Sequence, residues 1–126
     1  MTTIKAYTDL EQSKTLAEIL PIESADMFLA LNGNIPVMSK YIDDGLVTAD
    51  NTAIPCWSLA ALLNILHSRQ DDIISLSGGG YKDGKYISDW CVDYEFDDGN
   101  YQKTFSYNPV DACVEMIIKL HEQKLL

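Results

Sequence analysis

Three residues in the middle of the chain have the spacing of a phosphate-binding loop. Gly79, Gly84 and Lys85 fit the pattern G-x-x-x-x-G-K, in which backbone amides and the lysine hold the phosphates of a nucleotide. That loop also needs a serine or threonine after the lysine, to bind magnesium, and a helix whose N-terminus faces the phosphates. Here Tyr86 follows Lys85, and the pattern beyond it predicts a strand. We therefore expect a loose glycine-rich connection and no nucleotide cofactor at this position.

Helix geometry excludes a thiol–imidazole pair within either cysteine-containing helix segment. Cys56 and His67 are eleven residues apart, about 16 Å along a helix axis, and Cys113 and His121 are eight apart, about 12 Å. A pair formed between different elements, such as Cys91 with either histidine, stays open from the sequence. A cysteine on an apolar helix stripe usually packs as a small hydrophobic residue, however. The cysteines and histidines also lack the local spacing of a zinc site, so no metal is expected.

Five acidic residues follow one another closely without an intervening base. They are Asp89, Asp93, Glu95, Asp97 and Asp98, and we call them the acidic strip. An EF-hand loop starting at Asp93 would need glycine at its sixth position and glutamate at its twelfth, where the chain has Asp98 and Thr104. Calcium is therefore not expected. Alternating acids usually mark the solvated face of a strand, and we predict that a basic protein partner would bind there.

The net charge of the chain is strongly negative. Nineteen acidic residues against nine basic ones give −10, and Arg69 is the only arginine. Proteins that bind nucleic acids or anionic membranes usually carry a cluster of lysine and arginine, and this sequence has none, so neither partner is expected. The simplest role of the surplus acid is solubility, and attraction of a basic partner is the alternative.

Cysteine usage and hydropathy favour a cytoplasmic protein. Three cysteines without close spacing are typical of reduced thiols. The longest apolar run, residues 59–66, contains Asn64 and is far shorter than the roughly 20 residues that span a bilayer. The first twenty residues lack the basic start and apolar block of a secretion signal. We therefore expect no association with membranes.

The last third of the chain predicts a β-hairpin. Asp98-Gly99 is typical of a two-residue type I′ turn, which would place Phe96 opposite Tyr101. In that register eight residues share one face, and seven of them are aromatic or apolar. The eight are Trp90, Val92, Tyr94, Phe96, Tyr101, Lys103, Phe105 and Tyr107. The carboxylates of Asp93 and Glu95 would then lie on the opposite, solvated face.

A closing helix is predicted directly after this hairpin. Asn108 can cap its first turn, and Pro109 suits the first helical position because its missing N–H group costs nothing there. One apolar stripe follows at helical spacing, made of Val110, Cys113, Val114, Ile117 and Leu120. We expect this stripe to bury the aromatic face of the hairpin.

The first part of the chain predicts a helix and a second hairpin. Thr8 and Glu11 have the spacing of a capping box for a helix over residues 9–20. Residues 27–31 and 35–41 read as strands around an Asn32-Gly33 turn, and the second should be an edge strand because it contains Pro36. A further short strand is predicted at residues 46–48.

The middle of the chain predicts one apolar helix and one short strand. The helix covers residues 59–67 and should be the most buried one, starting at Pro55 or at a Ser58 cap. Residues 73–77 read as a strand, and residues 78–80 begin the glycine connection.

Four segments of the chain resemble a group of small uncharacterised proteins of gut Bacteroides-type bacteria and their phages and mobile elements. They are residues 7–13 (YTDLEQS), 19–27 (ILPIESADM), 54–65 (IPCWSLAALLNI) and 108–126. The third segment is the most distinctive, and the region around residues 78–85 diverges. Members of this group have no assigned activity, so the resemblance implies a phage or mobile-element setting and no catalytic residue.

These patterns predict one α+β domain over residues 1–126. We expect an antiparallel sheet of about four to five strands, packed on one face by two or three helices and ending in a β-hairpin and a C-terminal helix.

The expected function is that of a small acidic cytosolic accessory protein that binds another protein and is not an enzyme. One alternative is a hydrolase or transferase whose cysteine, histidine and carboxylate groups meet across elements. Another is an acidic nucleic-acid mimic that inhibits a DNA-binding protein. A homodimer formed through an unpaired edge strand, residues 35–41, is a further prediction.

Overall fold

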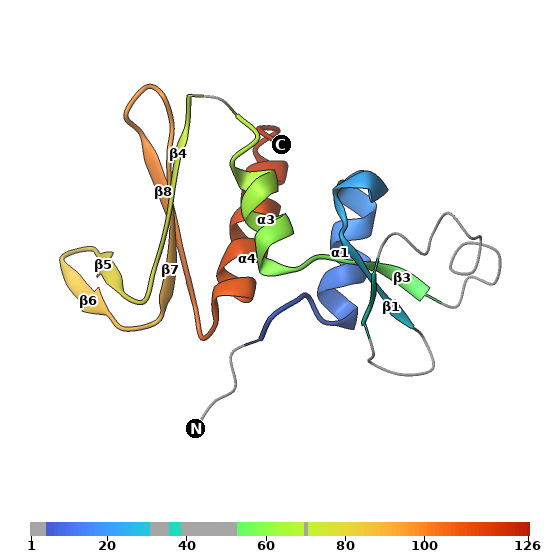
Figure 1. The fold of residues 1–126 in the computed structure, drawn as a ribbon. Helices are drawn as coiled ribbons and strands as arrows, with labels where there is room; N and C mark the ends of the chain where they lie inside the picture. The colour runs from blue at the N-terminus through green and yellow to red at the C-terminus, as the bar shows by residue number, and fades with distance from the viewer. Residues whose placement is uncertain (1–4, 31–35, 39–52, 70) are drawn as a thin grey trace. The chain divides into compact units, whose positions relative to one another are not determined.

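The computed structural model describes residues 5–30, 36–38, 53–69 and 71–126. It has α+β architecture with antiparallel strands, and it ends in a hairpin followed by a helix, which confirms the predicted class (Figure 1). Among the described residues the strands form two three-stranded sheets and one two-stranded sheet, where a single sheet was expected. The predicted Asn32-Gly33 turn and the strand at residues 46–48 lie outside the described residues.

The chain divides into two compact units. The N-terminal unit is Ala6–Ala61, and the C-terminal unit is Leu62–Leu126 together with Lys5. Helix α3 (Leu59–Leu66) crosses the boundary between them. The assignment of residues 1–126 to one domain stays a prediction. In the described ranges, every helix is too short or too polar to cross a bilayer.

The N-terminal unit combines helix α1 (Leu10–Ile19), the 3-10 turn η1 (Ile22–Ser24) and a sheet with the strand order β2-β1-β3. Its strands are β1 (Met27–Ala30), β2 (Pro36–Met38) and β3 (Ala53–Cys56), and both pairs are antiparallel. Among the described strands, β2 lies at the edge of this sheet, as predicted from the missing N–H group of Pro36.

The cap of α1 lies one residue later than predicted. Asp9 is the capping residue: its carboxylate accepts from the Gln12 amide at 2.8 Å, while the Gln12 side chain accepts from the Asp9 amide at 3.1 Å. The predicted box starting at Thr8 is wrong because the Thr8 side chain is fully buried. Its hydroxyl lies 2.8 Å from Ser13 Oγ and accepts from the Trp57 amide at 3.1 Å, so it is not available for capping.

Ser58 is the cap of α3. Its Oγ accepts from the Ala61 amide at 3.2 Å, whereas Pro55, the alternative start, lies in strand β3. Asp26 holds Ser58 in place by accepting from both its amide and its hydroxyl. The prediction that this is the most buried helix is wrong, because only Leu62 and Leu66 of α3 are fully buried.

The C-terminal unit is a sheet with a helix on one face. Strands β4 (Ile73–Ser77), β7 (Trp90–Glu95) and β8 (Tyr101–Ser106) are antiparallel in the order β4-β7-β8. Helix α4 (Pro109–Glu122) lies along one face of this sheet (Figure 1). It begins as predicted, because the Asn108 side chain accepts from the Asp111 amide at 2.8 Å and Pro109 opens the first turn. The whole predicted apolar stripe of this helix is buried.

The register of the β7–β8 hairpin differs by one residue from the prediction. Trp90 lies opposite Ser106, and Glu95 lies opposite Tyr101. The face predicted for β7 is correct, since Val92 and Tyr94 are fully buried on the α4 side. The face predicted for β8 is inverted: Gln102, Thr104 and Ser106 lie on the α4 side, while Tyr101, Lys103 and Phe105 share the opposite face with Cys91, Asp93 and Glu95.

The hairpin loop explains this difference. Phe96 and Asn100 close a loop of three residues, with hydrogen bonds from Gly99 N to Phe96 O at 3.0 Å and from Phe96 N to Asn100 O at 2.7 Å. Only Gly99 has a positive φ, 91°, whereas a type I′ turn would need a positive φ at Asp98 as well. The added residue reverses the two faces of β8. Thr104 lies on the inward side, and its hydroxyl is satisfied there because it donates to Ala112 O at 2.7 Å.

The segment predicted as a loose glycine connection is a third hairpin. Strands β5 (Gly80–Lys82) and β6 (Lys85–Ile87) are joined by Asp83 and Gly84, both with positive φ, 52° and 82°, as in a type I′ turn. Gly80 lies directly on the sheet, because a Cβ there would be 3.2 Å from Cys91 Sγ and 3.2 Å from the Phe105 ring. The hairpin therefore covers part of the sheet face opposite α4.

Candidate protein-binding surface

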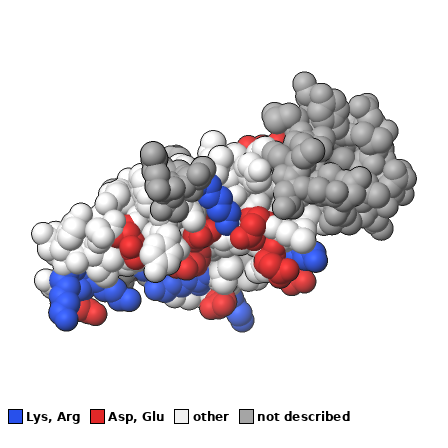
Figure 2. Space-filling model, turned by 90° about the horizontal axis from the view of Figure 1, so that it is seen from below, with Lys and Arg blue, Asp and Glu red and all other residues white. Residues whose placement is uncertain are grey.

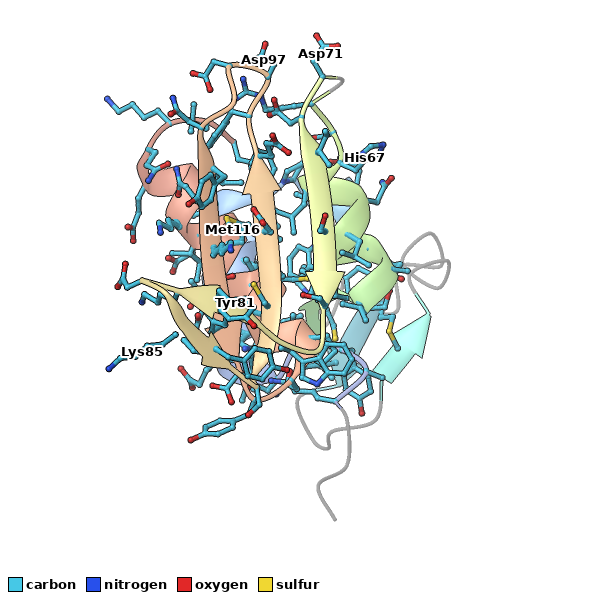
Figure 3. The ribbon with its side chains drawn as sticks, turned by 90° about the vertical axis from the view of Figure 1, so that its left-hand side faces the viewer. His67, Asp71, Tyr81, Lys85, Asp97 and Met116 are labelled. Atoms are coloured by element: carbon cyan, nitrogen blue, oxygen red, sulfur yellow. The ribbon has the colours of Figure 1, made fainter. Side chains whose placement is uncertain are left out.

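The face of the β4-β7-β8 sheet that is opposite α4, here named the outer face, consists of three rows of side chains. The first row is Ile73, Glu95 and Tyr101, the second is Ser75, Asp93 and Lys103, and the third is Ser77, Cys91 and Phe105. Figure 3 views this face, with the β5–β6 hairpin in front of the sheet and α4 behind it. The hairpin lies on the third row, where Cys91 is only 2% exposed, and the first row remains open to solvent.

A groove of about 290 Å³ crosses the first two rows. It is lined by Asp93, Glu95, Tyr101 and Lys103. The Lys103 ammonium donates to the backbone oxygen of Tyr81 at 3.1 Å and lies 5.5 Å from the centre of the Tyr101 ring. The lysine thus links the β5–β6 hairpin to the sheet and contacts the aromatic wall of the groove.

The carboxylate of Asp93 is incompletely satisfied. Asp93 lies opposite Lys103 in the strand pair, but the Lys103 ammonium bonds to Tyr81 O instead. Oδ1 of Asp93 is inaccessible to solvent and has no hydrogen-bond donor among the described residues. Leaving a buried acceptor without a donor costs about 1–3 kcal/mol, so such a group calls for a structural or functional explanation.

The structure brings only two residues of the acidic strip together in a site. Asp93 and Glu95 line the groove, whereas Asp97 and Asp98 lie in the loop after β7 and Asp89 lies just before β7. The Asp98 carboxylate accepts from both the amide and the side chain of Asn100, at 2.9 and 3.0 Å, and so stabilises that loop. Figure 2 shows acidic and basic side chains interleaved on the face seen from below. In the groove, Asp93 and Glu95 lie beside Tyr101 and Lys103. That a basic partner binds the acidic strip stays a prediction.

Several residues of this surface were not expected from the sequence. Tyr101, which was predicted to lie under the closing helix, is 64% exposed, and Ile73 in the same row is 58% exposed. On the hairpin, Tyr81 and Tyr86 are also exposed, and their rings pack edge to face with centres 5.4 Å apart. The signal that could have placed Tyr101 is the run Asp97-Asp98-Gly99, which also suits a three-residue hairpin loop with glycine last.

The buried carboxylate of Asp72, outside the groove, was also not expected from the sequence. Asp72 is 4% exposed, and its Oδ2 accepts from the Tyr94 hydroxyl at 2.6 Å and pairs with Arg69 Nε at 3.0 Å. Its Oδ1 accepts from the Asp97 amide at 3.1 Å. Burial, and then the hydrogen bond to Asp72, raise the pKa of Tyr94 well above its usual value. Both carboxylate oxygens of Asp72 and the Tyr94 hydroxyl therefore have partners, and the cluster anchors the loop after β7.

The three thiols are poor candidates for a nucleophile. Cys56, Cys91 and Cys113 are free and buried, and burial raises the pKa of each, for Cys113 from 9.0 to about 12. Because the thiolate is the reactive form, these cysteines are held in the unreactive state at neutral pH. In the described part of the chain, no hydrogen bond joins a thiol to a histidine: His67 is exposed, and His121 Nδ1 lies 3.3 Å from Leu126 O.

Neither metal-binding geometry nor similarity to known proteins adds a further candidate site. Within the described residues, no three histidine, cysteine or acidic side chains lie close enough together to hold a metal ion. Comparison with protein-family models, curated proteins and solved structures found no match. The resemblance to uncharacterised Bacteroides-type proteins therefore stays a prediction, and a functional proposal depends on the geometry of the outer face.

The native protein should resist thiol alkylation. We expect iodoacetamide at mildly alkaline pH to label none of the three cysteines of the native protein. Over the same time, all three should be labelled in protein unfolded by guanidinium chloride. Folding raises the pKa of Cys113, so burial of its neutral thiol contributes fully to the stability of the folded protein below pH 9.0. This contribution is lost as the pH rises toward about 12. Intact-mass spectrometry gives the number of labels. Rapid labelling of one native cysteine would contradict this expectation and favour the thiol-based enzyme alternative.

Proposed function

We propose that this protein acts by binding another protein and that the outer face is its binding surface. The observation that carries the proposal is the first row, in which two exposed apolar or aromatic side chains, Ile73 and Tyr101, flank the carboxylate of Glu95. The groove includes Glu95 and Tyr101 of this row, and the β5–β6 hairpin, whose Tyr81 and Tyr86 are exposed, covers part of the same face. Exposed aromatic residues surrounded by polar groups are typical of protein interfaces.

The other candidate functions have weaker support. A hydrolase or transferase would need an activated nucleophile, and burial raises the pKa of all three thiols. A nucleic-acid mimic would need rows of unpaired carboxylates, and on the outer face these alternate with Lys103 and Tyr101. A cytosolic accessory role in a phage or mobile element, which the resemblance implies, is part of the proposal and is compatible with a small binding protein.

Affinity capture from cells of the source organism tests the proposal. The bait is the full chain, compared with the double variant Ile73→Ser/Tyr101→Ser. We expect this variant to lose about tenfold or more of its binding to at least one captured protein, because exposed aromatic residues at an interface often dominate its affinity. Binding is quantified by titrating the identified protein against each bait.

The matched control is Ile22→Ser/Tyr107→Ser, which replaces the same residue types at exposed positions that belong to none of the three rows. It should bind as the unmodified chain does. Circular dichroism checks that both variants are folded. If the outer-face variant binds every captured protein as tightly as the control does, the outer face is not the binding surface.

A further inference from the structure

We infer that the groove receives a guanidinium group, so that the segment recognised on the partner carries an arginine side chain. This inference rests on the proposed function and specifies the chemistry that the outer face would select. It is argued from the carboxylates of the groove, the ring beside them and the position of the chain's own lysine.

One carboxylate that lines the groove has an oxygen without a hydrogen-bond donor in the described part of the chain, and that oxygen is inaccessible to solvent. Asp93 and Glu95 are two residues apart on one strand and therefore point to the same side of the sheet. Ionised carboxylates only accept hydrogen bonds, and Oδ1 of Asp93 has no donor among the described residues. Lys103, which lies opposite Asp93 in the strand pair, donates to Tyr81 O. A cationic donor entering the groove would draw the Asp93 carboxylate outward and supply the missing hydrogen bond.

The Tyr101 ring favours a planar cation over a compact one. Tyr101 lies directly opposite Glu95 in the strand pair and is 64% exposed. A guanidinium can stack on this ring while the N–H groups at its edge reach the neighbouring carboxylate. A lysine ammonium is a strongly hydrated point charge and cannot make both contacts with the same geometry. The groove should therefore bind arginine more tightly than lysine.

Lys103 acts as an internal competitor in this arrangement. Its ammonium is 5.5 Å from the centre of the Tyr101 ring, within the range of a cation–π contact. An incoming guanidinium would share the ring with this charge and be repelled by it. Replacing Lys103 by methionine keeps most of the apolar stem and removes the charge, so this variant should bind arginine more tightly. A lysine with only a structural role would not produce a gain.

The test is a titration of the isotope-labelled full chain with three acetylated and amidated tripeptides, Gly-Arg-Gly, Gly-Lys-Gly and Gly-citrulline-Gly. Citrulline keeps the shape of arginine without its charge. We expect the arginine peptide to shift the amide signals of β7 and β8, the lysine peptide to bind about threefold more weakly, and the citrulline peptide to have no effect. The short peptides limit general attraction to the net charge of −10.

Variants locate the binding to the groove. Asp93→Asn and Glu95→Gln should each weaken binding of the arginine peptide about tenfold, Tyr101→Leu should weaken it about threefold, and Lys103→Met should strengthen it about threefold. The matched control is Glu122→Gln, which removes the same charge from an exposed site on α4. It should leave the affinity unchanged. The amide spectrum of each variant shows directly whether it is folded.

The inference is overturned if citrulline binds as arginine does, if lysine binds as tightly as arginine, or if Glu122→Gln weakens binding as much as Glu95→Gln. It is also overturned if no peptide shifts the signals of the outer face. If a captured protein still depends on Ile73 and Tyr101 in any of these cases, the proposed function stands without a guanidinium site. If capture is insensitive to both residues but the peptide results hold, the groove binds a cationic ligand and the proposed function falls.

Discussion

Replacing Asp72 by alanine should lower the free energy of unfolding by about 3 kcal/mol, because it removes a buried carboxylate that accepts from three donors. Asp72 is 4% exposed and accepts from the Tyr94 hydroxyl at 2.6 Å, from Arg69 Nε at 3.0 Å and from the Asp97 amide at 3.1 Å. Without this carboxylate, three donors lose their acceptor, and the buried tyrosine hydroxyl has no alternative partner in water. Equilibrium unfolding in denaturant measures the difference.

The neighbouring Asp71 provides the matched control, because it is exposed and Asp71→Ala removes the same charge. This control should change the stability by less than about 0.5 kcal/mol. Tyr94→Phe, which deletes a single hydrogen bond of the cluster, should cost about 1 kcal/mol. Equal effects of the Asp72 and Asp71 substitutions would show that the Asp72 carboxylate is not a buried anchor of the loop.

Thr104→Lys should destabilise the C-terminal unit by at least about 3 kcal/mol, because it places a charge without a partner against α4. Thr104 is 8% exposed and its hydroxyl donates to Ala112 O at 2.7 Å, so this position faces the helix. In the register predicted from a type I′ turn, the same residue would lie on the solvated face, and a lysine there would be tolerated. Chemical denaturation followed by circular dichroism therefore distinguishes the two registers.

A near-isosteric substitution separates the effect of charge from that of the hydrogen bond. Thr104→Val should cost about 1 kcal/mol, because it removes one donor while keeping the shape of the side chain. If Thr104→Lys is as stable as the unmodified chain, the register described for β8 is wrong. In that case Tyr101 would also lie under α4, and the proposed binding surface would lose its aromatic wall.

The one-residue difference in register changes the functional interpretation of the chain. With a type I′ turn, the face that carries Asp93 and Glu95 would also carry Gln102 and Thr104, and the acidic strip would be a polar, negative surface. The three-residue loop instead places Tyr101 and Lys103 beside those carboxylates. The result is a groove that combines an aromatic ring, two acids and a lysine. This combination is the basis of both functional proposals.

The sequence by itself determined the elements whose signals are local. The start of α4 follows from Asn108 and Pro109, its buried side from an apolar repeat, and the face of β7 from alternation along one strand. Each of these depends on a few consecutive residues. The α+β class follows from the same local patterns.

Only the tertiary structure decided the features that depend on distant groups. The face of β8 depends on whether Asp98 or only Gly99 adopts a positive φ, and the inward side of that strand is stabilised by a hydrogen bond from Thr104 to the helix that follows. The Asp72 cluster joins groups from two segments, and the β5–β6 hairpin is held on the sheet by Lys103. The energies of such contacts are comparable to the local preferences of a turn, so the packed structure selects among turns that the sequence allows about equally well.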